Sequence, residues 1–177
     1  PILDAVRVEA GRGMPVIGVC NGFQVLCEAG LLPGALLLNA SEKFVCRNVY
    51  LRAEARDSLW TRGVDRILEI PIAHGEGRFV ADSLRTLSRI KGAGQVALRY
   101  VGDVNGSEED IAGICDATGR IFGLMPHPER YLEWTRHPYW TRLPVGVRRG
   151  ETPGLRMFRS AVFGLFFFPL AFYAFYL

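Results

Sequence analysis

Lysine, histidine and paired cysteines are scarce in this sequence. Of the 21 lysine and arginine residues, only Lys43 and Lys91 are lysines. The other 19 are arginines, and they are scattered along the chain. A net charge of +3 without a basic cluster argues against a nucleic-acid-binding surface. The four cysteines show no C-x-x-C spacing, and the three histidines are not grouped. We therefore expect no nucleic-acid partner, no metal site and no disulfide framework.

A recognisable targeting segment is also lacking. Asp4, Arg7 and Glu9 interrupt any apolar stretch near the first residue, which argues against a signal peptide. A chain of 177 residues has the size of one domain. We expect a cytoplasmic enzyme. Three of the cysteines are expected to be ordinary core residues: Cys27, Cys46 and Cys115.

Charge is absent from the last part of the chain. Residues 160–177 contain no charged side chain and are crowded with phenylalanine and tyrosine, and this run approaches the length of a membrane span. Pro169 falls inside the run, however, and no basic residue follows it. We interpret residues 166–177 as an apolar aromatic tail outside a domain that spans 1–165, and we expect no membrane association. A membrane anchor stays the alternative.

The most informative segment present lies at residues 15–24. A short apolar run ends in Gly18-Val19-Cys20-Asn21-Gly22, and a helical pattern follows. This order is typical of a nucleophile elbow, a sharp turn from strand to helix that lifts one side chain clear of the sheet. We expect the two glycines to let strand and helix approach closely and the start of the helix to favour the thiolate of Cys20. The backbone N–H of Asn21 could donate to an oxyanion. A buried cysteine at the end of a core strand is the alternative.

A second segment offers a base for that thiol. Residues 121–125 form another apolar run of strand length, and a loop with His127 and Glu129 follows. A thiol nucleophile needs a base, and the base needs an orienting group. We expect His127 to accept the thiol proton and Glu129 to hold its imidazole in one tautomer, in a loop that flanking prolines stiffen. A loop histidine without a role is the alternative, which the two segments together disfavour.

The whole pattern alternates helices and strands. We expect helices at 3–10, 22–29 and 82–90, and strands at 15–19, 45–53, 67–72, 96–101, 111–116 and 121–125. This order fits an α/β fold with a parallel sheet flanked by helices and an added antiparallel portion. Ligands of such sheets bind at the carboxyl ends of strands, where Cys20 and His127 both fall.

Five motifs carry a resemblance to a known family. They occupy residues 18–24, 28–36, 39–47, 70–79 and 123–130, in the family's order. Together they resemble the class I (triad) glutamine amidotransferases, and among these the glutaminase subunits of phosphoribosylformylglycinamidine synthase in de novo purine biosynthesis. In GMP synthases a tyrosine follows the cysteine. Asn21 stands at that position here and distinguishes the chain from those relatives. The resemblance extends from about the first residue to about residue 165.

The resemblance implies a flavodoxin-like fold and a glutaminase mechanism. Cys20 would attack the side-chain amide of glutamine and form a thioester, and His127 would pass the thiol proton to the leaving ammonia. The ammonia would go to a large ATP-dependent synthetase subunit, accompanied by a small accessory subunit. No cofactor is implied for this subunit, because ATP and magnesium belong to the synthetase partner.

The resemblance also bears on side chains around the thiol. Gln24 and Phe44 are expected to line the glutamine site; a solvent-facing helix residue is the alternative for Gln24. His74 and Glu76 lie in a loop with two glycines, which we interpret as a pocket rim or a partner contact, against the alternative of a plain turn.

One family feature is not found in this sequence. Family members begin with a strand and a Pro-Gly-Gly-Phe-Ser-Tyr-Gly-Asp loop, which supplies the second oxyanion amide. We therefore expect N-terminal strands to be missing and the activity of the chain as given to be impaired.

Two other function classes stay open. One is an α/β cysteine hydrolase of other specificity, against which Gln24 and residues 39–47 argue. The other is a catalytically inactive interaction fragment, which the missing loop favours.

Overall fold

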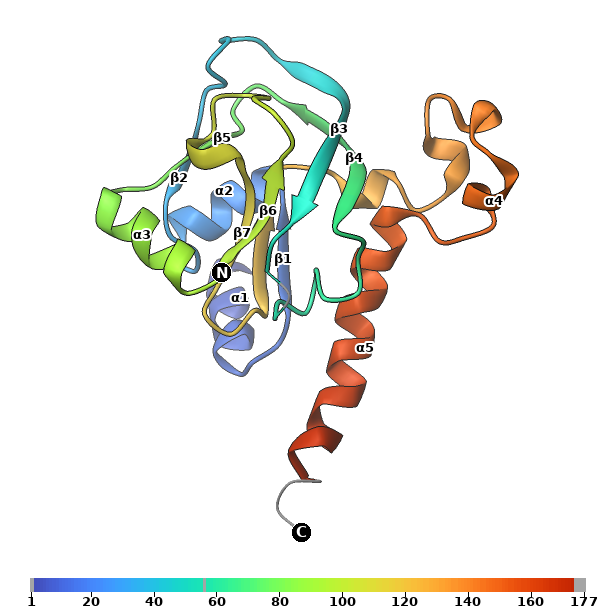
Figure 1. Ribbon diagram of the computed structural model, residues 1–177. Helices are drawn as coiled ribbons and strands as arrows, with labels where there is room; N and C mark the ends of the chain where they lie inside the picture. The colour runs from blue at the N-terminus through green and yellow to red at the C-terminus, as the bar shows by residue number, and fades with distance from the viewer. Residues whose placement is uncertain (1, 56, 174–177) are drawn as a thin grey trace.

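A mixed sheet of six strands forms the centre of the molecule (Figure 1). The computed structural model describes residues 2–55 and 57–173, without the side chains of 166–173. The strands follow the order β1-β8-β7-β6-β3-β4 across the sheet, and β1 pairs with β8 in parallel whereas the other four pairs are antiparallel. Their bounds are β1 (Val16–Val19), β3 (Val45–Ala53), β4 (Ile67–His74), β6 (Val96–Tyr100), β7 (Ile111–Cys115) and β8 (Ile121–Leu124).

The predicted strands are all present, and the parallel part of the sheet is a single pair. The register of that pair runs from Val16 opposite Ile121 to Val19 opposite Leu124, so the two strands end level with each other. β7 and β8 are buried along their whole length, which explains why both read as continuous apolar runs rather than as alternating ones. In β4 the buried residues alternate instead, because only one of its faces is covered throughout.

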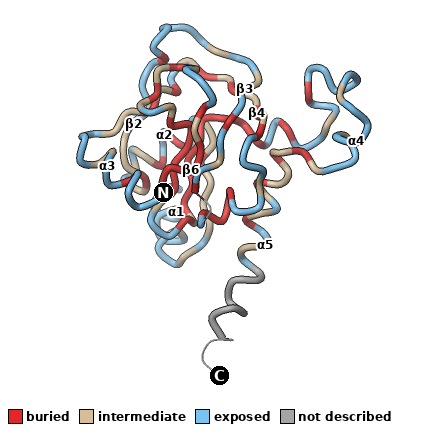
Figure 2. Tube along the Cα trace, in the orientation of Figure 1, coloured by how far each residue is buried: buried red, intermediate tan, exposed pale blue. Residues whose placement is uncertain are grey.

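Two apolar clusters cover the two faces of the sheet. Phe122 belongs to one cluster and its strand neighbour Ile121 to the other, and successive residues of a strand point to opposite faces. The first cluster includes Met157 from the long helix α5 (Pro153–Tyr173). The second includes Phe23 from α2 (Asn21–Glu28) and Ile90 from α3 (Leu84–Gly92), with α1 (Ile2–Gly11) beside them. Figure 2 shows the buried residues concentrated along the strands between these helices.

Several short elements were not predicted. A two-stranded antiparallel sheet joins β2 (Ala35–Leu37) to β5 (Arg78–Val80). Four 3₁₀ turns lie in the described part of the chain: η1 (Glu108–Asp110), η2 (Pro128–Arg130), η3 (Trp134–Arg136) and η4 (Trp140–Arg142). A single-turn helix, α4 (Val145–Arg148), precedes α5. Elements of three or four residues are too short to show a hydrophobic period, so no pattern in the sequence marks them.

The cysteines outside the elbow differ in burial. Cys115 is buried in β7 and Cys27 is half-buried, as expected of core residues, but Cys46 is exposed. The prediction for Cys46 is wrong because β6 pairs with β3 only from Leu51 to Ala53. The first part of β3 therefore pairs with β4 alone and projects beyond the covered centre of the sheet.

Helix α5 passes the boundary at residue 165 without a break. The side chains of residues 166–173 and all of residues 174–177 lie outside the described part of the structure, so the predicted tail stays a prediction. Among the described residues, no helix combines the length and the apolar character that crossing a membrane requires.

Candidate active site

The turn between β1 and α2 holds Cys20 in a strained backbone conformation. Its φ is 52° and its ψ is −108°, values that a non-glycine residue rarely adopts. The N–H of Cys20 donates to the carbonyl of Leu124 at 2.8 Å, which extends the parallel pairing by one residue and fixes the turn against β8. The sharp turn expected of a nucleophile elbow is therefore present at Cys20.

Only one of the two elbow glycines is required by close packing. A Cβ on Gly18 would lie 2.5 Å from the carbonyl oxygen of Gly22 and 2.6 Å from Leu26 Cδ1, so no larger residue fits there. A Cβ on Gly22 would meet nothing within 4 Å. The prediction for Gly22 is wrong because its backbone carbonyl, and not its Cα hydrogen, faces the strand.

His127 follows β8 directly and is held from two sides. Its N–H donates to the carbonyl of Pro71 in β4 at 2.8 Å, and its Nδ1 lies 2.7 Å from Oε1 of Glu129. Burial raises the pKa of Glu129, but the hydrogen bond with His127 and the nearby charges of His127 and Arg130 bring that pKa below its usual value. Glu129 is thus a carboxylate that accepts from Nδ1–H, which leaves Nε2 of His127 as the proton acceptor.

A single cavity of about 580 Å³ brings the predicted residues together. Seven of them line it: Cys20, Asn21, Gln24, Phe44, His74, Glu76 and His127. Glu129 does not line the cavity, but it contacts Nδ1 of His127. Arg130 also lines the cavity and was not predicted as a site residue, although it closes the motif at 123–130. The arrangement offers a thiol, a base and an orienting carboxylate to one bound molecule.

The surroundings of Cys20 favour the protonated thiol over the thiolate. Burial raises its pKa, the N–H of Asn21 and the guanidinium of Arg130 lower it, and the carboxylate of Glu129 raises it again; the net pKa is above the usual value. The predicted effect of the helix start is therefore present through Asn21 but is outweighed by burial. Sγ lies 4.0 Å from the carbonyl oxygen of Ala73. A protonated thiol needs a base before it can attack, which is the part that His127 can play.

Gln24 and the loop after β4 form one wall of the cavity. Nε2 of Gln24 donates to the carbonyl of Glu76 at 3.0 Å and ties helix α2 to this loop. Glu76 is exposed at the rim, and Phe44 is two-thirds exposed at the mouth of the cavity. The expected contacts of Gln24 and Phe44 with a substrate stay predictions.

His74 is not a rim residue, because it is the last residue of β4 and only 3% exposed. Its Nδ1 lies 3.0 Å from Oδ1 of Asn39, a buried residue that also accepts from the N–H of Gly77. Asn39 belongs to the motif at 39–47 but was not singled out, because its contact with His74 joins positions 35 residues apart. No local pattern predicts such a contact.

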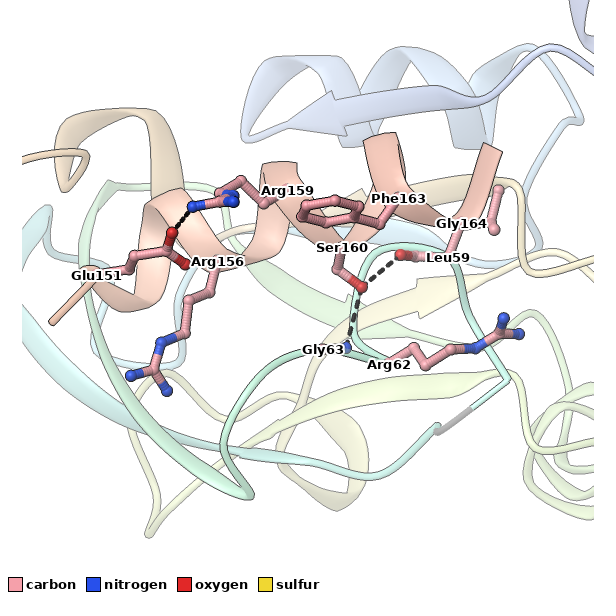
Figure 3. Close-up of a pocket in the computed structure, with 9 residues that line it drawn as sticks. All are labelled: Leu59, Arg62, Gly63, Glu151, Arg156, Arg159, Ser160, Phe163 and Gly164. Atoms are coloured by element: carbon pink, nitrogen blue, oxygen red, sulfur yellow. Dashed lines mark hydrogen bonds and ion pairs between the residues drawn. The ribbon is translucent and has the colours of Figure 1, made fainter. Parts of the chain in front are cut away.

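A second hollow lies along α5 and lacks this chemistry (Figure 3). It measures about 520 Å³, and Ser160 bridges its two sides by donating to the carbonyl of Leu59 and accepting from the N–H of Gly63. Arg159 forms an ion pair with Glu151 there. This hollow contains neither a thiol nor a histidine, so we assign the chemistry to the cavity at Cys20. Within the described residues, no three His, Cys, Asp or Glu side chains are grouped to hold a metal ion.

Known proteins match both the sequence and the fold. The family model for the CobB/CobQ-like glutamine amidotransferase domain matches residues 6–163. The chain belongs to this family. The glutamine amidotransferase resemblance predicted from the five motifs is thereby confirmed.

Several relatives of this amidotransferase share a narrower name. Phosphoribosylformylglycinamidine synthase subunit PurQ of Mycobacterium bovis is 53% identical over 135 residues, which are 75% of this chain and 60% of the relative. The subunit of the same name from Novosphingobium aromaticivorans is 47% identical over 167 residues, 93% of this chain and 68% of the relative. The chain thus spans about 60% of the length of the first of these.

Solved structures confirm the fold of the amidotransferase. A chain in the structure of PurLQS from Thermotoga maritima is 40% identical, with a TM-score of 0.76 over 93% of this chain and 68% of that one. A glutamine amidotransferase from the same organism, 14% identical, has a TM-score of 0.57 over 90% of this chain and 66% of that one and shares the fold alone. The α/β class I glutamine amidotransferase fold, with a mixed sheet flanked by helices, is therefore established.

Proposed function

We propose that this amidotransferase is the glutaminase part of a phosphoribosylformylglycinamidine synthase. It would hydrolyse glutamine to glutamate and ammonia, and the ammonia would be consumed by an ATP-dependent synthetase. The observation that carries the proposal is the 2.7 Å contact of His127 with Glu129 at the wall of the cavity that also contains Cys20. The names of the PurQ relatives support the choice of synthase.

The reaction follows from the roles of these three side chains. Nε2 of His127 takes the proton of Cys20, and Sγ forms a bond to the amide carbon of glutamine. The oxygen of the tetrahedral intermediate carries the negative charge, which the N–H of Asn21 stabilises. His127 then returns its proton to the nitrogen, the C–N bond breaks, and ammonia leaves. Water, deprotonated by His127, attacks the thioester and releases glutamate and the thiol.

The proposal includes two partners. The similar chain from Thermotoga maritima was solved in a structure of PurLQS, and by analogy we propose a large synthetase subunit and a small accessory subunit for this chain. ATP and magnesium would act in the synthetase subunit, because the hydrolysis derived above requires only the thiol, the base and water. A cytoplasmic location stays a prediction.

Replacing the nucleophile tests the proposal. Cys20→Ala should abolish glutamine-dependent synthesis by the complex and leave ammonia-dependent synthesis intact, since the thiol serves only the glutaminase site. Cys46→Ala is the matched control, because Cys46 is exposed on β3 and does not line the cavity. Glutamine hydrolysis that persists in Cys20→Ala would rule out the proposed mechanism. Loss of both syntheses would favour an interaction role for Cys20, and hydrolysis of other amides in preference to glutamine would favour a different cysteine hydrolase.

A further inference from the structure

His74 has one nitrogen with no hydrogen-bond partner in the described part of the chain. The side chain is 3% exposed, and its Nε2 is closed off from solvent and makes no hydrogen bond there. The residue lines the same cavity as Cys20 and His127. Buried polar atoms in native proteins are almost always paired, and one that is not requires an explanation. The mechanism derived above does not use His74.

Asn39 determines which nitrogen of His74 carries the proton. The Nδ2 of Asn39 donates to two carbonyls, that of Lys43 at 2.8 Å and that of His74 itself at 2.9 Å. Its Oδ1 is therefore the acceptor that faces Nδ1 of His74. An acceptor at that position requires a proton on Nδ1, so Nε2 carries the lone pair.

His74 is also neutral at physiological pH. Burial lowers its pKa to about 4, with a smaller contribution from the charge of His127. Both imidazoles line the same cavity. Nε2 of His74 can thus only accept a hydrogen bond, and the described part of the chain supplies no donor for it.

We propose that His74 is a further catalytic residue, whose Nε2 accepts a hydrogen bond from the amide nitrogen of glutamine during C–N cleavage. The inference rests on the proposed glutaminase function. When Sγ adds to the carbonyl carbon, the amide nitrogen becomes tetrahedral and gains a lone pair that must face the protonated His127. An N–H held by His74 orients that lone pair. The nitrogen then takes the proton of His127 and the electron pair of the breaking C–N bond, and leaves as ammonia.

A pair of substrates separates this role from all others. The γ-methyl ester of glutamate forms the same thioester with Cys20, but its leaving group is an oxygen without an N–H. In His74→Phe, with the protein assembled with its synthetase partners, kcat/KM for glutamine should fall about tenfold or more relative to kcat/KM for the ester. His74→Gln offers an amide oxygen as acceptor and should restore part of this ratio.

The ratio is measured within one protein sample, so a partly unfolded variant does not alter it. Cys46→Ala, outside the cavity, should leave the ratio at its wild-type value. An unchanged ratio in both His74 variants would overturn the proposal. This is also the result expected if His74 instead bound the α-ammonium group, because both substrates carry that group and would be affected equally. Cys20→Ala distinguishes a failure of the function itself: if that variant still hydrolyses both substrates, the glutaminase mechanism is wrong regardless of His74.

Discussion

Glu129 is the residue through which the imidazole of His127 is oriented. In Glu129→Gln the side-chain amide can donate a hydrogen bond to Nδ1 of His127. This favours the tautomer that has its proton on Nε2, and a protonated Nε2 cannot accept the thiol proton. We expect kcat for glutamine to fall at least about tenfold while KM changes little, because the cavity wall is left in place. Steady-state glutamate release measures both constants. An unchanged kcat would remove Glu129 from the mechanism.

The lowered pKa of His74 predicts how the stability of the fold depends on pH. Its pKa of about 4 in the folded protein lies below the ordinary value of 6.5 given for histidine, so the unfolded chain takes up a proton first as the pH falls. The folded state should thus keep its full stability above about pH 6.5 and lose up to about 3 kcal/mol between there and pH 4.

Urea unfolding at pH 7 and pH 4.5 measures this loss. His74→Phe lacks the titrating group, so its free energy of unfolding should decline less over the same interval. Equal declines in the wild type and the variant would mean that folding does not lower the pKa of His74.

At the scale of elements, the elbow offers a matched pair of glycines. Gly18→Ala should destabilise the protein by about 1–3 kcal/mol, because the added Cβ overpacks the contact between β1 and the first turn of α2. Gly22→Ala should be neutral or stabilising by up to about 1 kcal/mol, because the site is open and alanine favours a helix. Denaturant unfolding compares the two. Equal effects would show that the strand and helix are not packed as described.

The sequence predicts the strands of the central sheet better than it predicts what surrounds them. β3 was predicted with its observed bounds, and Cys20 and His127 were expected to meet because each follows a strand that ends at the same edge. The hydrogen bond of His74 was not predictable, since its partner Asn39 lies in a distant segment. The raised pKa of Cys20 likewise comes from burial by the assembled fold, which outweighs the local effect of Asn21.

At the scale of the whole molecule, the domain boundary at residue 165 can be tested by truncation. Among the α5 side chains that the structure describes, Met157 and Ala161 are the buried ones of the core, whereas Phe163 and Leu165 are exposed to 49% and 39%. A chain that ends at residue 165 should therefore keep the melting temperature of the longer chain to within a few degrees. Ending the chain at residue 156 removes Met157 and should lower the melting temperature strongly. Thermal unfolding of the three chain lengths measures these melting temperatures. A large decrease in melting temperature on removal of residues 166–177 alone would place that segment inside the domain.

Gly154, at the start of α5, packs against the turn that follows His127 and carries Glu129. A Cβ there would lie 2.2 Å from the carbonyl oxygen of Pro128 and 2.5 Å from that of Tyr131, so α5 supports η2 directly behind His127 and Glu129. On a ribosome, Cys20 emerges early and this support emerges late. A nascent chain can expose its thiol long before its base is held in place. Until residues 153–157 have been synthesised, the turn behind His127 lacks this packing contact, so the imidazole and its carboxylate are not yet held as in the folded protein.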